Sequence, residues 1–237
     1  MGLRDKVVVR EITRDAAKDI IERFHYAHIL GPVSYTLGVY YKQDHVFFDD
    51  HEELVGAIAY ARPLGRLSVK SISEKLDISQ SLELTRLFIH DGYPKNIESY
   101  SIARSFTWIR ENLPKVEVLL SYSDPEQGHL GIVYQASNWL YQGTGFSIMD
   151  KYRLSLTKTP YDWIHHRTIY DNYGTVSIDE LKRQIGHTFW LKKETNKHRY
   201  IYLLKNRKYW LEHLKYPVLP YPKEIIKQEE EIEEIVI

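Results

Sequence analysis

The chain of 237 residues contains no cysteine, which removes several functional classes at once. Without a thiol there is no disulfide, no thiolate zinc site and no catalytic cysteine, and this agrees with a reducing cytoplasm. No apolar run approaches the roughly 20 residues that span a bilayer. The first 13 residues also lack the apolar segment of a secretory signal. We therefore expect a cytoplasmic protein with no membrane partner.

The chain also lacks net charge, because 32 Lys and Arg balance 32 Asp and Glu, but the charges are unevenly placed. Residues 192–223 hold nine Lys/Arg against two Glu, and residues 224–237 hold six Glu against one Lys. Aromatic residues interleave with the basic ones, a composition that suits phosphate neutralisation and base stacking. The alternative is a solvated face over a small aromatic core. The expected nucleic-acid contacts are Lys197, Arg199, Lys205, Arg207 and Lys208.

The dinucleotide fingerprint G-x-G-x-x-G is absent as well, yet residues 83–145 have the pattern of a βαβ unit. Strands are expected at 84–89 and 116–122, and a helix between them begins after Asn96 as its N-cap and ends before Pro114. A second helix is expected at 131–141. Such a unit places its strands side by side and parallel, with ligands beyond their carboxyl ends.

The other segments predict a single mixed sheet flanked by helices, in the α/β or α+β class. A first domain is expected over 1–159, an appended basic module over 160–223, and a flexible or helical acidic tail over 224–237. Before the βαβ unit we expect strands at 7–12, 35–41 and 54–61, a helix capped by Thr13, and a short helix at 73–76. After it we expect a strand at 146–156, a helix opened by a capping box at Ser177, a strand at 197–204 and a helix at 205–214.

Three motifs resemble the phage Mom DNA-modification family: ELTRL at 83–87, SYSDPEQGH at 121–129, and IVYQASNW at 132–139 followed by Gly143-Thr144. The resemblance implies a divergent member of the GNAT acyltransferase superfamily that uses acetyl-CoA. It also implies modification of the N6 amine of adenine in phage DNA, which prevents cutting by host nucleases. The implied product is carbamoylmethyl-like, and simple acyl transfer would not produce it. The usual GNAT glycine turn is replaced here by residues 94–99.

The resemblance points to seven site residues, and four of them have a structural alternative. The implied catalytic residues are His25, Tyr26, Asp124 and Tyr134, and the implied cofactor-binding residues are Arg86, Asn96 and Ser99. Arg86 could instead form an ion pair with Glu83 or Asp124, and Asp124 could cap the segment that follows it. Tyr134 could simply pack, and Ser99 could bond back within its own helix.

Histidine spacing raises the question of a metal. His25 and His28 could share a face, and Asp124 would complete a two-histidine, one-carboxylate set of the kind that holds Fe(II). The alternative is that this His-x-x-His pair is incidental. The cluster at 45–51 and the pair His165-His166 are both interpreted as solvated loops.

Two other functions remain open. One is a conventional small-molecule N-acetyltransferase, and the other is a DNA-binding protein that keeps the fold without catalysis. If adenine in a duplex is the target, the enzyme must extrude the base or act on single strands.

Overall fold

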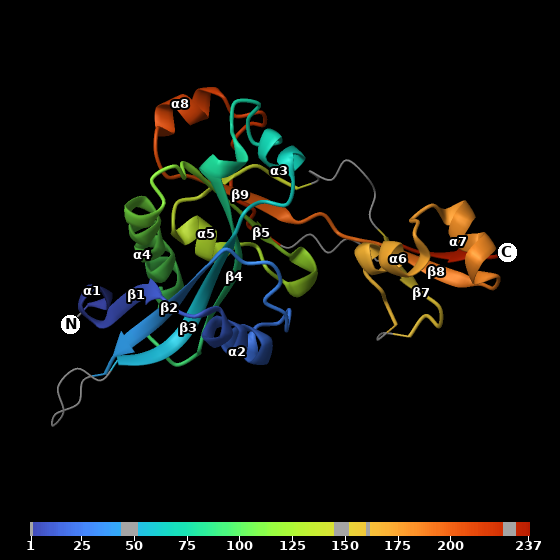
Figure 1. Cartoon of the computed structure of the whole chain (residues 1–237), viewed down its shortest axis with the longest axis horizontal. Helices are drawn as coiled ribbons and strands as arrows, with labels where there is room; N and C mark the ends of the chain where they lie inside the picture. Colours follow the sequence, from blue (N-terminus) through green and yellow to red (C-terminus); the bar gives the residue numbers. More distant parts are fainter. Residues whose placement is uncertain (1, 44–51, 145–151, 160–161, 225–230) are drawn as a thin grey trace. The chain divides into compact units, whose positions relative to one another are not determined.

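The computed structural model describes residues 2–43, 52–144, 152–159, 162–224 and 231–237. The chain folds as two compact units, which are described separately (Figure 1). The first unit comprises Met1–Ser123, His129–Thr144 and His198–Lys223. The second comprises Asp124–Gly128, Gly145–Lys197 and Glu224–Ile237.

The first unit is built on a seven-stranded sheet of order β1-β2-β3-β4-β5-β9-β6. Only β4 and β5 pair in parallel, and the other neighbours are antiparallel. The mixed sheet and its parallel βαβ unit are therefore confirmed. The strands are β1 (Val7–Glu11), β2 (Tyr35–Lys42), β3 (Glu52–Ala61), β4 (Ser81–Ile89), β5 (Val118–Ser123), β6 (Leu140–Tyr141) and β9 (His198–Leu203).

Helices cover both faces of this sheet, because successive strand residues point to opposite sides. Leu119 joins the core cluster under α4 (Ile97–Asn112) and α5 (Ile132–Ala136). Its neighbour Leu120 joins a cluster with Trp210 of α8 (Arg207–Glu212) and Val69 of α3 (Arg66–Lys70). On that second face α2 (Arg14–Phe24) packs its Ala17, Ile20 and Ile21 against alanines of β3. The short elements α1 (Leu3–Lys6), η1 (Ile78–Gln80) and η2 (Pro125–Gln127) complete the list with those of the second unit.

The helix starts and ends predicted from local sequence signals are partly confirmed. Thr13 caps α2 by accepting a bond from the Ala16 amide at 3.2 Å, as predicted. The helix expected at 131–141 ends at Ala136, because Asn138 takes a positive φ of 61° and the chain turns to bury Trp139 and enter β6. The short helix expected at 73–76 is wrong: α3 and η1 lie on either side of it.

The structure divides the chain differently from the predicted boundaries. β9 lies inside the main sheet, between β5 and β6, so residues 198–223 belong to the first unit rather than to an appended module. The indole nitrogen of Trp210 donates to Glu117 Oε2 at 2.7 Å and fastens α8 to the start of β5. The main sheet buries the apolar residues of β9, which include Tyr200, Ile201 and Leu203.

The second unit has its own three-stranded antiparallel sheet of order β10-β8-β7. The predicted strand at 146–156 becomes β7 of this sheet, although residues 145–151 lie outside the described part. The acidic tail contributes β10, since Ile235 is buried in this unit's core. The elements are β7 (Tyr152–Ser155), α6 (His166–Tyr173), α7 (Ile178–Ile185), β8 (Phe189–Lys193) and β10 (Ile232–Ile235).

The helix predicted from Ser177 is α7, and it ends at Gly186 as expected. Ser177 occupies the N-cap position without making a side-chain cap bond, so the capping box itself is not formed. Within the described ranges, no helix combines the length and the apolar character needed to cross a membrane.

Candidate active site

The two parallel strands of the first unit separate before they end. Their ladder runs from Ser81 opposite Val118 to Leu84 opposite Ser121 and stops there, although β4 continues to Ile89. An irregularity against β3 falls at the same point, because Arg86 pairs with Ala59 and Leu84 with Tyr60, which leaves Thr85 as an extra residue. Such a bulge bends its strand. The backbone of β4 beyond Leu84 therefore lacks a ladder partner on the β5 side.

Tyr134 of α5 brings its hydroxyl to the last pair of that ladder. The hydroxyl lies 2.8 Å from Ser121 Oγ, which in turn donates to the Leu84 carbonyl at 2.8 Å. Burial raises the pKa of Tyr134 to about 12, and the bond from Ser121 only partly opposes this. The hydroxyl consequently stays protonated at physiological pH, so it can donate a proton or hydrogen bond but cannot serve as a base.

His25 follows α2 directly and is 8% exposed. Burial, followed by the nearby Arg86, lowers its pKa to about 4, so the ring is neutral at physiological pH. Its Nδ1 lies 3.1 Å from the Ala27 amide, which is a donor. This geometry assigns the ring proton to Nε2. A neutral imidazole of that tautomer presents an N–H donor rather than a base at its outer nitrogen.

Tyr26 and His129 extend this cluster toward solvent. The Tyr26 ring is 48% exposed, and its centroid lies 4.3 Å from that of His25 and 5.1 Å from that of His129. Tyr26 and His129 meet edge to face. Tyr26 also interacts electrostatically with Tyr134. The structure thus brings His25, Tyr26 and Tyr134 together.

The sequence interpretation gave His129 no role, although it lies within the SYSDPEQGH motif. It lies six residues after the end of β5, and its proximity to His25 and Tyr26 was not visible from spacing alone. It contributes, with Arg86 and His28, to lowering the pKa of His25. We define His25, Tyr26, Arg86, His129 and Tyr134 as the edge cluster.

Arg86 ties the segment after α2 to β4. Its Nε donates to the Ile29 carbonyl at 2.9 Å and its Nη1 to the Thr85 carbonyl at 2.7 Å. These acceptors differ from the carboxylates considered in the sequence. Because carbonyls do not neutralise the guanidinium, a positive charge remains beside His25.

The N-terminus of α4 is open. Asn96 holds the N-cap position but adopts a positive φ of 70° and makes no side-chain cap bond, so the predicted cap is wrong in its chemistry. Ser99 Oγ donates back to the Asn96 carbonyl at 3.1 Å, which is the structural alternative for this residue. An uncapped helix N-terminus presents amide donors and a positive dipole end to an anion.

Asp124 begins the second unit and is 8% exposed. Its Oδ1 accepts from the Glu126 amide at 3.0 Å, which is the capping alternative, and its Oδ2 pairs with Lys197 at 3.2 Å. Since Asp124 and Arg86 belong to different units, their predicted convergence on one cleft stays a prediction.

The predicted metal set of His25, His28 and Asp124 stays a prediction, because Asp124 belongs to the other unit. His25 Nδ1 faces the Ala27 amide, and His28 Nδ1 faces the Glu22 carbonyl at 3.0 Å. The charge nearest His25 is the guanidinium of Arg86, which disfavours a cation. Across the described ranges, the only grouping with metal-ligand spacing is His165, His166 and Glu194, where a solvated loop was expected. The cluster at 45–51 lies outside the described residues.

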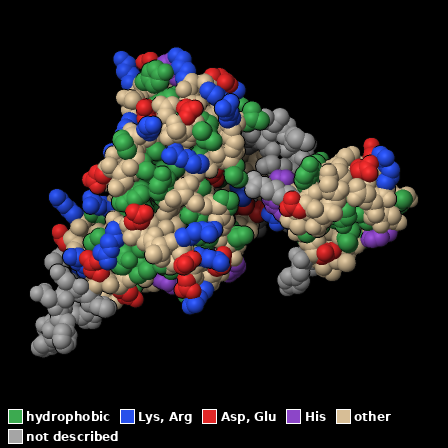
Figure 2. All heavy atoms as spheres, in the orientation of Figure 1, with side chains coloured by type: hydrophobic (Ala, Val, Ile, Leu, Met, Phe, Trp, Pro, Cys, Tyr) green, Lys and Arg blue, Asp and Glu red, His purple; other side chains and the backbone are tan. Residues whose placement is uncertain are grey.

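The predicted nucleic-acid residues do not form one surface. Arg199 is fully buried because it lies on β9, an interior strand of the sheet, so it is not a surface contact. Lys205, Arg207 and Lys208 follow the end of β9 that pairs with Val118, which is opposite to the end at Ser123. Figure 2 shows Lys and Arg side chains gathered around α8 at the top of this view. Lys197 belongs to the second unit.

Comparison with known proteins gives one family and several structures. Residues 6–223 match the Mom protein family. The chain is 29% identical over 214 residues to the methylcarbamoylase Mom of Escherichia phage Mu, which covers 87% of this chain and 80% of that protein.

Among solved structures, the chain is similar to a spermidine/spermine N-acetyltransferase from Vibrio cholerae, with 10% identity and a TM-score of 0.46 over 88% of this chain and 98% of that one. It is also similar to an N-acetyltransferase from Staphylococcus aureus Mu50, with 10% identity and a TM-score of 0.42 over 84% and 99% of the two chains.

Proposed function

The chain belongs to the Mom protein family and is a transferase, and from this premise we propose that it modifies the N6 amine of adenine in phage DNA. The modification is carbamoylmethyl-like, takes place in the host cytoplasm and protects the DNA from host restriction. The observation that carries the proposal is the edge cluster, in which four residues implied by the family resemblance lie together where β4 and β5 separate.

The proposed donor is an acyl-CoA-type molecule, acetyl-CoA or a relative. The uncapped N-terminus of α4 offers amide donors for its pyrophosphate. The backbone of β4 beyond Leu84, which has no ladder partner in β5, offers amide and carbonyl groups to an extended chain. A bound donor would supply an activated carbonyl carbon at this edge of the sheet.

The proposed acceptor is adenine held against Tyr26. Nearly half of this ring is exposed, and an exposed aromatic face can stack an extruded or single-stranded base. Arg207 and Lys208 on α8 are exposed and could neutralise phosphates further along the strand. In this proposal the exposed Tyr26 ring positions the adenine base, and the basic side chains of α8 fix the position of the DNA strand through its phosphates.

In this proposal His25, Tyr134 and Asp124 serve the attack of the adenine amine on the carbonyl carbon of the donor, which forms an N-acyl bond and releases the thiol of CoA. The further chemistry that leads to a carbamoylmethyl-like product is assigned to no residue. The Nε2–H of His25 donates to the oxygen that gains negative charge in the transition state. The neutral Tyr134 hydroxyl supplies the proton that a leaving thiolate takes up. Asp124 accepts a proton from the adenine amine, a role that stays a prediction from the family resemblance.

No step of this proposal runs through iron. His25 and His28 turn Nδ1 toward backbone groups, and the guanidinium of Arg86 lowers the pKa of His25, so nothing within the first unit favours a cation shared by these two imidazoles.

Mass spectrometry of nucleosides from phage or plasmid DNA in expressing cells tests the proposal. We expect a modified adenosine with the parent chain and with Tyr170→Phe, whose exposed tyrosine lies in the second unit, and a much smaller amount with Tyr134→Phe. An unmodified nucleoside profile with the parent chain would contradict the proposal. DNA retention without modification would favour the binding protein, and acetylation of small amines alone would favour the conventional acetyltransferase.

A further inference from the structure

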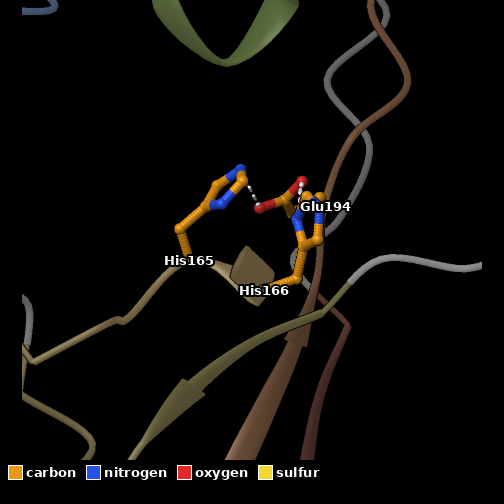
Figure 3. Close-up of side chains that lie close together, drawn as sticks. All are labelled: His165, His166 and Glu194. Atoms are coloured by element: carbon orange, nitrogen blue, oxygen red, sulfur yellow. Dashed lines mark ion pairs between the residues drawn. The ribbon is translucent and has the colours of Figure 1, made fainter. Parts of the chain in front are cut away.

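A second group of histidines lies in the second unit, away from the residues used above. His165 and His166 stand at the beginning of α6, and Glu194 directly follows β8 (Figure 3). One ligand atom from each of the three lies within 4.8 Å of the others. Two segments of this unit thus bring together two imidazoles and one carboxylate.

The spacing of these atoms is that of metal ligands rather than of direct hydrogen bonds. His165 Nε2 lies 3.3 Å from Glu194 Oε1, and His166 Nδ1 lies 3.7 Å from Glu194 Oε2. Hydrogen bonds from nitrogen to carboxylate are shorter, about 2.7–2.9 Å. Ligands held at about 2.0–2.1 Å around a tetrahedral ion lie about 3.4 Å apart.

One carboxylate oxygen of this group lacks a hydrogen-bond donor. Glu194 Oε1 is buried and accepts no hydrogen bond from any residue that the structure describes. A buried acceptor of this kind carries a free-energy cost unless something satisfies it. A cation between Glu194 and the two imidazoles would satisfy it.

The surroundings hold Glu194 in place. Arg153 lies with its Nε 3.5 Å from Glu194 Oε1 and its Nη2 3.4 Å from Glu126 Oε2. The other Glu126 oxygen accepts from the Thr195 amide at 3.3 Å. Two carboxylates thus share one guanidinium, which leaves one negative charge. Outer partners of this kind commonly orient a metal-ligating carboxylate.

We propose that His165, His166 and Glu194 bind one divalent transition-metal ion of the zinc class, with its fourth position open to water or to a ligand. Two nitrogens and one carboxylate oxygen suit such an ion. The ion joins the start of α6 to the end of β8. Through Arg153 and Glu126 it also supports residues 124–128, the segment that contains Asp124.

The test measures metal binding by the full chain after chelator treatment and dialysis. Zn²⁺ or Co²⁺ is added, unbound metal is removed, and bound metal is counted by elemental mass spectrometry. We expect one ion per chain, visible absorption from tetrahedral Co²⁺, and a higher midpoint of thermal unfolding with metal. His166→Ala and Glu194→Gln should each lower the affinity at least tenfold.

His187→Ala is the matched control, because this exposed histidine of the second unit lies outside the group and should bind metal as the parent does. If His166→Ala or Glu194→Gln does not fold, His165→Gln decides the matter, since the His165 side chain is 46% exposed and its replacement should be tolerated. Failure of the parent to retain either ion would overturn the proposal, and so would full retention by His165→Gln. The three residues would then form an ion-pair network without a metal.

Discussion

The two histidine groups of this chain differ in the charge beside them. His25 in the first unit is buried next to a guanidinium and lies close to two other histidines, which together lower its pKa to about 4. His165 and His166 in the second unit share the carboxylate of Glu194. The first environment favours a neutral imidazole that donates a hydrogen bond, and the second favours a cation.

This contrast shows that the spacing of histidines along a chain is a weak guide to metal binding. His25 and His28 have the spacing expected for ligands on one face, yet their Nδ1 atoms face backbone groups. The adjacent pair His165-His166 has no comparable signal. Its carboxylate comes from a residue about thirty positions later, which only the fold brings near.

The largest effect should come from replacing His25 in two ways. An asparagine can still accept from the Ala27 amide but has no donor at the Nε2 position, so we expect modification to fall about 100- to 1000-fold. A glutamine places an amide donor near that position and should lose only about tenfold. Single-turnover rates on DNA would show the difference. Equal losses of rate in the two variants would mean that His25 does not act as a hydrogen-bond donor. Neither replacement should change the amount of metal bound at His165, His166 and Glu194.

Tyr134→Phe should come next. Loss of the hydroxyl removes the proposed proton donor and lowers the rate about 10- to 100-fold. It also removes the bond to Ser121, which should lower the free energy of unfolding by about 1 kcal/mol. Ser121→Ala should lower stability similarly while retaining most of the rate. If both variants lost the same activity, Tyr134 would act through packing alone.

The pH dependence of stability gives a smaller effect with a definite sign. The pKa of His25 is lower in the folded chain than in the unfolded chain, so the unfolded state binds more protons between about pH 4 and pH 6.5. The contribution is complete above pH 6.5 and is lost as the pH falls, by about 2 kcal/mol near pH 4 after allowance for solvent screening. Urea unfolding of the parent and of His25→Gln at several pH values measures it. An identical pH profile in the two proteins would contradict the assigned pKa.

Arg86→Met should produce the smallest effect. Removing the guanidinium should raise the pKa of His25 toward its ordinary value, but not to it, because burial is the larger cause. Histidine NMR titration measures the change. Arg104→Met on the exposed side of α4 is the control and should leave that pKa unchanged. A pKa of His25 unaltered by Arg86→Met would show that the guanidinium does not contribute to the shift.

The sequence predicted the elements whose signals are local. Thr13 marked the start of α2, Pro114 marked the end of α4, and the alternation in β4 and β5 predicted the parallel pair. The early end of α5 escaped prediction, because the burial of Trp139 and the positive φ of Asn138 depend on the finished sheet.

Long-range pairing explains the other differences. Nothing in residues 198–203 shows that they join a sheet formed mostly by the first half of the chain, and the buried Arg199 made them look like a basic surface. At the site, the family resemblance pointed to His25, Tyr26 and Tyr134, and the structure brings these three residues together. The protonation of His25 and the participation of His129 depend on burial and neighbouring charge, which no motif contains.

The most direct test of the contrast is a single histidine NMR experiment on the full chain, recorded with and without Zn²⁺. We predict that His25 remains neutral with its proton on Nε2 down to about pH 5 and does not respond to zinc. His165 and His166 should shift on addition of one equivalent. Zinc-dependent shifts of His25 with none at His165 and His166 would contradict the account.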